Sequence, residues 1–147
     1  MSFEQPEVLD LSALHDALIS LHDGLEVVSH PEWFNRQSDK VQNTLIAGVI
    51  KNFEFVYEIS IKMIRRRLEI GADSPTDVDK MEFRGLLRSA AERGLINNVE
   101  AWFKYRKMRN ITSHTYDHEK ARQVYQETVV FIDDARLLLQ QLEAMND

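Results

Sequence analysis

The sequence predicts an all-α fold, an antiparallel up-and-down bundle of four main helices with one short extra helix. Three observations favour this fold class. Hydrophobic residues recur at intervals of three and four along most of the 147 residues, which is the spacing of one helix face. No segment shows the period-two alternation of a β-strand. The chain contains 5 Gly and 3 Pro, too few for a turn-rich β architecture.

The first helix is expected after a frayed N-terminus of residues 1–9, with Asp10 or Ser12 as its cap. Its apolar stripe is short enough to favour a bundle helix over a coiled coil. We expect His30-Pro31 to end the helix and the polar residues up to Ser38 to form a connector. The stripe comprises Leu11, Leu14, Leu18, Leu21, Leu25 and Val28.

A long second helix is predicted from Asp39 to Leu68 or Ile70. Asp39, followed three residues later by Gln42, indicates a capping box at its start. Thirty residues at about 1.5 Å each make a rod of roughly 45 Å, which is long for a globular protein. Gly71 and the Ser-Pro pair that follows it end this helix.

Three more helices complete the single domain expected over residues 1–147. A shorter helix is predicted from Asp79 to Arg93, closed by Gly94. Asn97 with Glu100 indicates a second capping box, which opens a helix that continues through residue 111. The last helix is predicted from about residue 117 to residue 145, with an inward face of Ala121, Val124, Thr128, Phe131, Ala135, Leu138 and Leu142.

Composition narrows the functional classes. The chain has no Cys, which excludes disulfides, thiolate metal sites and a Cys nucleophile. It has neither a signal-like start nor an apolar run of about 18 residues, so we expect a cytoplasmic protein without a membrane partner.

The net charge of −6 is unevenly distributed. Residues 1–35 carry seven acids and no Lys or Arg, whereas residues 101–122 carry six cations and two acids. The acidic first helix is therefore a candidate surface for a basic protein partner, and the later segment is a candidate for binding an anion.

Candidate chemistry concentrates between residues 104 and 116, which read Lys-Tyr-Arg-Lys-Met-Arg-Asn-Ile-Thr-Ser-His-Thr-Tyr. Arginine carries a planar, permanently charged guanidinium whose N–H donors suit a phosphate, and histidine can accept and donate protons near neutral pH. Together they suit phosphodiester cleavage without a metal. The histidine would deprotonate a ribose 2′-hydroxyl or protonate the leaving oxygen, while arginine stabilises charge on phosphorus. Gly-rich phosphate loops and His-Glu-x-x-His zinc motifs are absent from the sequence, so no metal is expected.

Two alternatives remain open at this point. The segment could be a basic helix end stabilised by the helix dipole, with His114 capping a carbonyl. In an unbroken helix, Arg109 and His114 would also lie about 140° apart and would not converge. Either the helix ends near residues 111–113, which a cap at Asp117 would support, or the site combines side chains of two chains.

The order Arg109-x4-His114-x-Tyr116, with Asn110 directly after the arginine, resembles the Arg-x4–6-His motif of the HEPN superfamily. The strings from 108 to 117 and from 53 to 58 (Phe-Glu-Phe-Val-Tyr-Glu) are similar to two signatures of its nucleotidyltransferase substrate-binding branch. The resemblance covers roughly residues 9 to 143. It implies a helical bundle that forms a homodimer and is encoded beside a separate, minimal nucleotidyltransferase.

In the HepT–MntA toxin–antitoxin systems of this branch, the HEPN partner is a metal-independent ribonuclease. The nucleotidyltransferase silences it by attaching AMP to the motif tyrosine. The resemblance therefore implies RNA or a nucleotide as ligand and no cofactor. By residue, it implies catalysis by Arg109 and His114, support from Asn110, and modification of Tyr116. From the residue types of the segment itself we expect support from the Ser113 hydroxyl and RNA or nucleotide binding by the cations Lys104, Arg106 and Lys107. Tyr105, if its ring is exposed, is expected to add to this binding by stacking on a base.

Two other functions compete with a ribonuclease. A non-catalytic subunit could present substrate to its nucleotidyltransferase, and would bind nucleotide without cleaving RNA. A plain helical scaffold would do neither. The chain lacks the Gly-Ser and paired-Asp motif of nucleotidyltransferases, so it is not expected to transfer nucleotides by itself.

Overall fold

The computed structural model describes residues 8–112 and 117–146. The described residues form helices and contain no strand, which confirms the predicted all-α bundle. Seven helices are present in them where the sequence predicted five. They are α1 (Ser12–Val28), α2 (Pro31–Asn35), α3 (Asp39–Ile70), α4 (Pro75–Asp79), α5 (Phe83–Glu92), α6 (Val99–Thr112) and α7 (His118–Met145).

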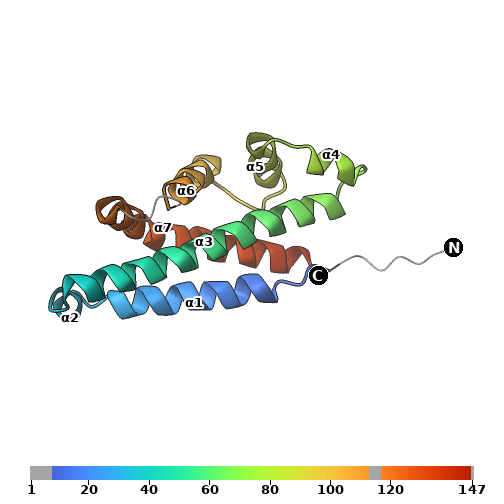
Figure 1. The fold of residues 1–147 in the computed structure, drawn as a ribbon. Helices are drawn as coiled ribbons and strands as arrows, with labels where there is room; N and C mark the ends of the chain where they lie inside the picture. The colour runs from blue at the N-terminus through green and yellow to red at the C-terminus, as the bar shows by residue number, and fades with distance from the viewer. Residues whose placement is uncertain (1–7, 113–116, 147) are drawn as a thin grey trace.

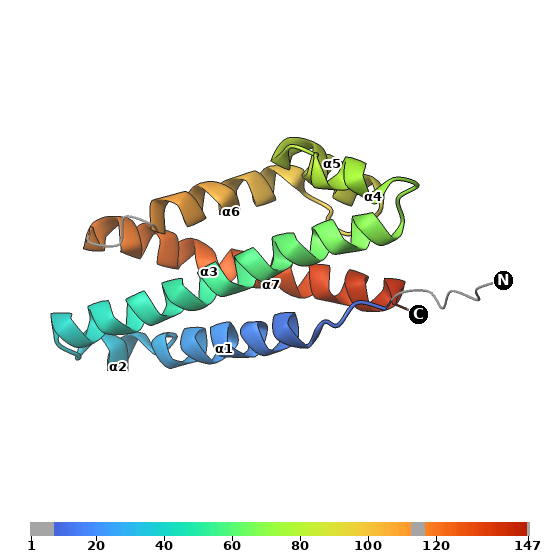
Figure 2. The ribbon, with the colours of Figure 1, turned by 45° about the vertical axis from the view of Figure 1, so that its right-hand side comes forward.

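Three long helices, α1, α3 and α7, lie side by side along the molecule, and α4, α5 and α6 cover the side of α3 away from α1 (Figure 1). The four main helices alternate in direction along the chain: α1 and α6 run toward one end, and α3 and α7 run toward the other (Figure 2). This is the predicted up-and-down order. None of the described helices is long and apolar enough to cross a membrane.

The two helices that the sequence analysis missed both begin at a proline. Pro31 is the first residue of α2 and Pro75 is the first residue of α4. From the sequence, both prolines are predicted to end a helix, but proline is also favoured in the first turn because no backbone N–H is needed there. Each short helix buries one apolar side chain, Phe34 or Val78, which holds it against the bundle. The predicted helix from Asp79 begins later, as α5.

Helix caps confirm one sequence prediction and correct two. Asp117 accepts hydrogen bonds from the N–H groups of residues 119 and 120, at 3.0 and 3.2 Å, as predicted for the start of α7. The cap of α3 is Ser38, whose hydroxyl accepts from the N–H of Val41, rather than Asp39. At α6 the cap is Asn98, not Asn97. In both corrected cases the capping residue lies one position away from the predicted one.

The N-terminal end is more ordered than predicted at Leu9. The backbone N–H of Leu9 donates to Oδ1 of Asn146 at 3.1 Å, and the Asn146 amide donates back to the Leu9 carbonyl at 3.0 Å. Leu9 is therefore fixed to the end of α7, which corrects the expectation of fraying at this residue. Residues 1–7 lie outside the described part of the chain.

An aromatic cluster fixes α6 against α3 and α7. Phe131 of α7 lies 4.7 Å from Phe53 of α3 between ring centres, and 4.8 and 5.9 Å from Tyr105 and Trp102 of α6. The rings meet edge to face, the favourable arrangement for aromatic pairs. All four residues are buried. Because Tyr105 precedes Arg109 by about one helical turn, this cluster also determines where Arg109 emerges.

Candidate functional site

A cavity of about 640 Å³ opens between α3, α6 and α7. Arg109 lies on its wall together with the charged residues Lys51 and Glu54. Two small residues of α3, Ala47 and Gly48, line the cavity. The space beside Gly48 is open, because a Cβ atom placed there would have no other atom within 4 Å. The volume lies within the range of small-molecule sites. The other lining residues are Asn43, Ile46, Ile50, Thr112, His118 and Ala121.

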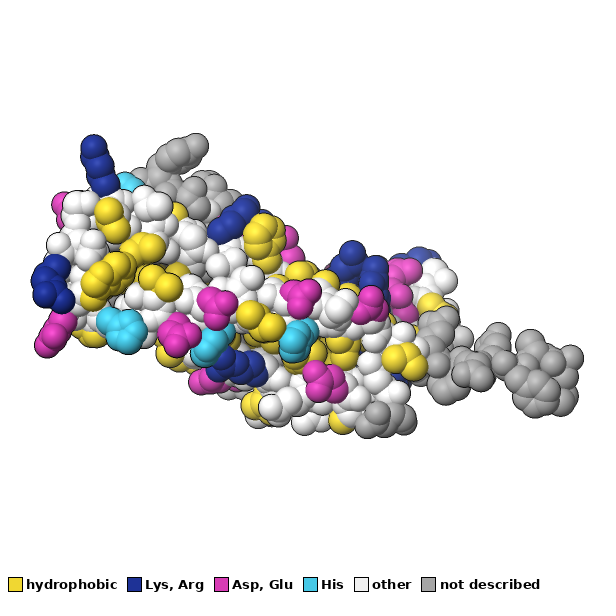
Figure 3. Space-filling view, turned by 90° about the horizontal axis from the view of Figure 1, so that it is seen from below, with side chains coloured by type: hydrophobic (Ala, Val, Ile, Leu, Met, Phe, Trp, Pro, Cys, Tyr) yellow, Lys and Arg dark blue, Asp and Glu magenta, His cyan; other side chains and the backbone are white. Residues whose placement is uncertain are grey.

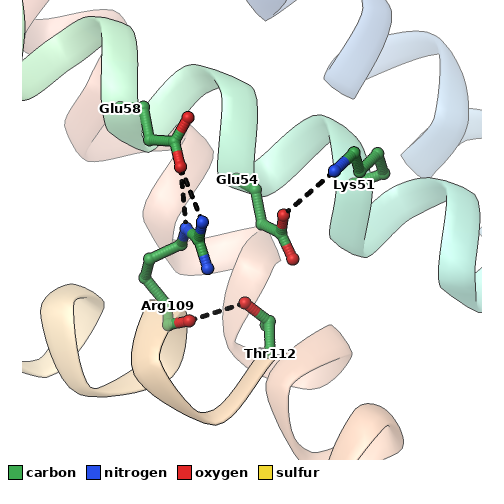
Figure 4. A network of polar contacts seen from close by, with 5 residues as sticks. All are labelled: Lys51, Glu54, Glu58, Arg109 and Thr112. Carbon is green, nitrogen blue, oxygen red and sulfur yellow. Dashed lines mark hydrogen bonds and ion pairs between the residues drawn. The ribbon is translucent and has the colours of Figure 1, made fainter. Parts of the chain in front are cut away.

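Arg109 is fixed by a carboxylate on the neighbouring helix. Its Nε and Nη2 atoms both donate to Oε1 of Glu58, at 3.0 and 2.7 Å. These bonds raise the pKa of the Arg109 guanidinium above its usual value, against a smaller opposing effect of burial, so the group stays charged. Among the described residues no hydrogen bond involves Nη1, and Figure 4 shows the third guanidinium nitrogen on the side of Glu54. This arrangement orients the guanidinium and leaves the edge that carries Nη1 directed toward a possible ligand.

A second carboxylate, Glu54, lies one turn before Glu58 on α3. It is 8% exposed, and Nζ of Lys51 lies 3.5 Å from its Oε2 atom. Its charge also raises the pKa of Arg109. Both acids belong to the Phe53–Glu58 string, yet the sequence analysis gave them no role. The available signal was their spacing of four residues, which places two acids on the same side of a helix.

The two helices on either side of the motif are separate, as predicted: Asp117 has an extended backbone and caps the second of them. Helix α6 ends at Thr112, whose hydroxyl donates to the Arg109 carbonyl at 2.7 Å, and α7 begins at His118. The predicted residues Ser113, His114 and Tyr116 fall in the segment 113–116, outside the described residues.

The basic residues of α6 lie on different sides of the helix instead of forming one surface. Lys104 forms an ion pair with Glu127 of α7 at 2.8 Å. Arg106, Lys107 and Asn110 line a separate hollow between α5 and α6. Of the predicted binding set, Arg106 and Lys107 therefore line this hollow, whereas Lys104 is held in an ion pair.

Tyr105 corrects another prediction. Its side chain is 1% exposed, so in this structure its ring cannot stack on a base as expected. The hydroxyl donates to the carboxylate of Asp134. Burial, and then this hydrogen bond, raise the pKa of Tyr105 far above its ordinary value. Tyr105 is therefore part of the hydrophobic core.

Comparisons with known proteins identify the family. A family model described as "Nucleotidyltransferase substrate binding protein like" matches residues 9–144. The chain belongs to this family. A Haemophilus influenzae protein named "Probable ribonuclease HepT" is 45% identical over 138 residues, 94% of each chain. A solved structure from the same species, described as revealing the fold of a substrate binding domain of a nucleotidyltransferase, matches with a TM-score of 0.87. Its sequence is 45% identical, and the match covers 91% of this chain and 99% of that one.

This member of the nucleotidyltransferase substrate-binding family has a mixed surface over α1, seen from below in Figure 3. The acids Asp16 and Glu26 are exposed there, as predicted for the first helix. His22 is also exposed, with Nδ1 2.8 Å from Nη2 of Arg136 and Nε2 3.6 Å from Glu26. His22, Asp23 and Glu26 lie close enough together to hold a metal ion, but exposed acidic groups often cluster without one.

Proposed function

We propose that this protein is a metal-independent endoribonuclease, a cytoplasmic toxin of the HepT kind, with Arg109 and His114 as its catalytic pair. The observation that carries the proposal is the Arg109 guanidinium, fixed by Glu58 in a cavity of nucleotide-binding size. The 45% identity to a protein named as a probable ribonuclease supports the choice of reaction.

Cleavage would proceed by transfer within the RNA strand. His114 takes the proton from a ribose 2′-hydroxyl, and the freed oxygen attacks the adjacent phosphorus. The bond from phosphorus to the 5′-oxygen breaks, and that oxygen takes a proton, leaving a 2′,3′-cyclic phosphate and a 5′-hydroxyl. Arg109 stabilises the charge that develops on the phosphorus oxygens, with Asn110 and Ser113 supporting the pair.

The test is RNA cleavage by the purified protein in excess EDTA. Arg109→Ala and His114→Ala are each expected to lower the rate by about a hundredfold or more. His15→Ala is the matched control, because His15 is exposed on α1 and is not among the residues lining the cavity. Cleavage that persists in His114→Ala, or that stops in EDTA, would contradict the proposal.

A homodimer completes the proposed enzyme, with each active site at the interface of two copies. Mixing Arg109→Ala and His114→Ala proteins tests this, because a shared site would assemble one intact pair from the two inactive chains. Recovered cleavage is the expected result. A monomeric mass in light scattering, with no recovery on mixing, would contradict it.

A separate minimal nucleotidyltransferase, encoded nearby, is the proposed regulator. The hydroxyl of Tyr116 would attack the α-phosphorus of ATP, and pyrophosphate would leave. Incubation with that enzyme, ATP and Mg²⁺ should add the mass of one AMP and abolish cleavage. Tyr116→Phe should gain no mass and stay active. An AMP adduct on the Tyr116→Phe protein would reject Tyr116 as the target.

A non-catalytic substrate-binding subunit is the second candidate. The description of the solved relative as a substrate binding domain favours it. The Glu58 pair also favours it, because two of the Arg109 donors are already engaged. This alternative predicts a stable complex with the nucleotidyltransferase, nucleotide binding in the cavity, and intact RNA under all conditions.

A further inference from the structure

A second hollow, of about 760 Å³, lies between α5 and α6. The half-buried rings of Phe83 and Phe103 line it, with their centres 5.9 Å apart. Cζ of Arg84 lies 4.8 Å from the centre of the Phe103 ring, and Cζ of Arg106 lies 4.4 Å from that of Phe83. Lys107 adds a third cation. We call this hollow the α5–α6 groove; it places flat apolar surfaces directly beside positive charge.

The cations of the α5–α6 groove differ from the other cations of α6 in having no carboxylate partner among the described residues. In the part of the chain that the structure describes, Arg84, Arg106 and Lys107 form no ion pair, whereas Lys104 and Arg109 each pair with a carboxylate. All three groove cations are exposed. An arginine stacked on a ring uses the face of its planar group, so its N–H edge can still bond a phosphate. The groove is therefore suited to an anionic ligand that also carries planar groups.

The groove runs along one side of α6 toward the end of the helix that carries Arg109. Phe103, Lys107 and Asn110 line it in order, and Asn110 is next in sequence to Arg109, which lines the first cavity from a side of α6 about 100° away. From Phe103 to Asn110 the helix rises by about 10 Å. That length spans roughly three stacked nucleotides at about 3.4 Å each. Two acids also line the groove, and one of them, Glu100, lies in the first turn of α6, at the end away from Arg109.

We propose that the α5–α6 groove binds the single-stranded RNA that extends from the candidate site. Its bases stack on the two phenylalanines and on the arginine planes, and its phosphates contact Arg84, Arg106 and Lys107. Unpaired bases have open faces for stacking, so a single strand fits better than a duplex. This inference rests on the proposed ribonuclease function and names the path of its substrate.

The experiment measures binding separately from cleavage. The probe is a fluorescent single-stranded RNA of about twelve nucleotides, with 2′-O-methyl groups that block cleavage, read by anisotropy across a salt series. The test variant is Arg84→Gln/Lys107→Gln. The control is Arg88→Gln/Lys80→Gln, which removes the same charge from exposed positions that are not among the groove-lining residues.

We expect the test variant to bind about tenfold more weakly than the control at low salt, with a salt slope smaller by about 1.4. A 2′-O-methyl dinucleotide should bind the test and control variants equally, because it is too short to enter the groove from the site. Glu100→Gln should strengthen binding of the long RNA by removing a negative charge. Equal long-RNA affinities and slopes for the two double variants would overturn the proposal, as would an equal loss with the dinucleotide. If the test variant binds the long RNA more weakly than the control but the wild-type protein leaves unmethylated RNA intact, the proposed ribonuclease function is wrong. RNA binding by the α5–α6 groove is then still supported.

Discussion

The pair of Arg109 and Glu58 gives the sharpest prediction. Both hydrogen bonds from Arg109 end on the same oxygen, Oε1 of Glu58, at 3.0 and 2.7 Å. In Glu58→Gln, the amide oxygen can take that position and accept both bonds. The substitution therefore keeps the geometry and removes the charge. It isolates how much the carboxylate contributes to orienting the guanidinium.

The magnitude follows from the exposure of the pair. In Glu58→Gln the guanidinium stays charged and keeps its hydrogen bonds, so the substitution removes only the attraction between the two opposite charges. The two side chains are 30% and 51% exposed, so solvent screening reduces this attraction to about 1 kcal/mol. At about 1.4 kcal/mol per factor of ten, the ratio of aligned to unaligned arginine conformers falls about fivefold, which sets the upper limit on the loss of activity. We expect kcat/KM for RNA to fall by up to about fivefold in Glu58→Gln and further in Glu58→Ala.

The assay is steady-state RNA cleavage with a matched control. Glu127→Gln removes the partner of Lys104, another acid–cation pair of α6, and should leave kcat/KM unchanged. In an Arg109→Ala background, Glu58→Gln should have no further effect, because the residue acts through the arginine. Faster cleavage in Glu58→Gln would refute the reasoning, since it would mean that Glu58 competes with the phosphate. An additive loss in the double variant would refute it as well.

Three further predictions concern the core. Phe131→Ala should lower the free energy of unfolding by about 4 kcal/mol in urea titrations, since it empties the aromatic cluster, whereas the exposed Val130→Ala should change it by about 0.5 or less. Tyr105→Phe should leave RNA affinity unchanged and lower stability by about 1 kcal/mol, because Asp134 loses its donor; weaker RNA binding without unfolding would mean that the Tyr105 hydroxyl contacts RNA. Burial raises the pKa of Tyr57 to about 12, so the folded state holds this proton more tightly than the unfolded state does. Stability should therefore fall as pH rises from about 10 to 12, by about 1.4 kcal/mol per pH unit at most, and fall less in Tyr57→Phe.

Local signals accounted for most of the fold. The apolar stripe of the first helix is buried or half-buried, and Asp117 caps α7 as the sequence indicates. The errors lie at prolines and at neighbouring cap residues. Pro31 and Pro75 are each compatible with the end of one helix and the start of another, and the choice depends on whether Phe34 and Val78 find a surface to pack against. That surface belongs to other helices, so no local pattern could reveal it.

The sequence by itself determined the all-α class, the start of a separate last helix at its Asp117 cap, and the segment in which the candidate chemistry is expected. These depend on helical periodicity and on capping residues, which act over a few neighbours. The tertiary structure alone decided that Glu58 holds Arg109 from 51 residues away, that Tyr105 faces the core, and that the cations of α6 divide between two hollows. Each of these depends on the angle at which α6 crosses α3 and α7. That angle is set by the packing of side chains from all three helices, and so it cannot be read from any one of them.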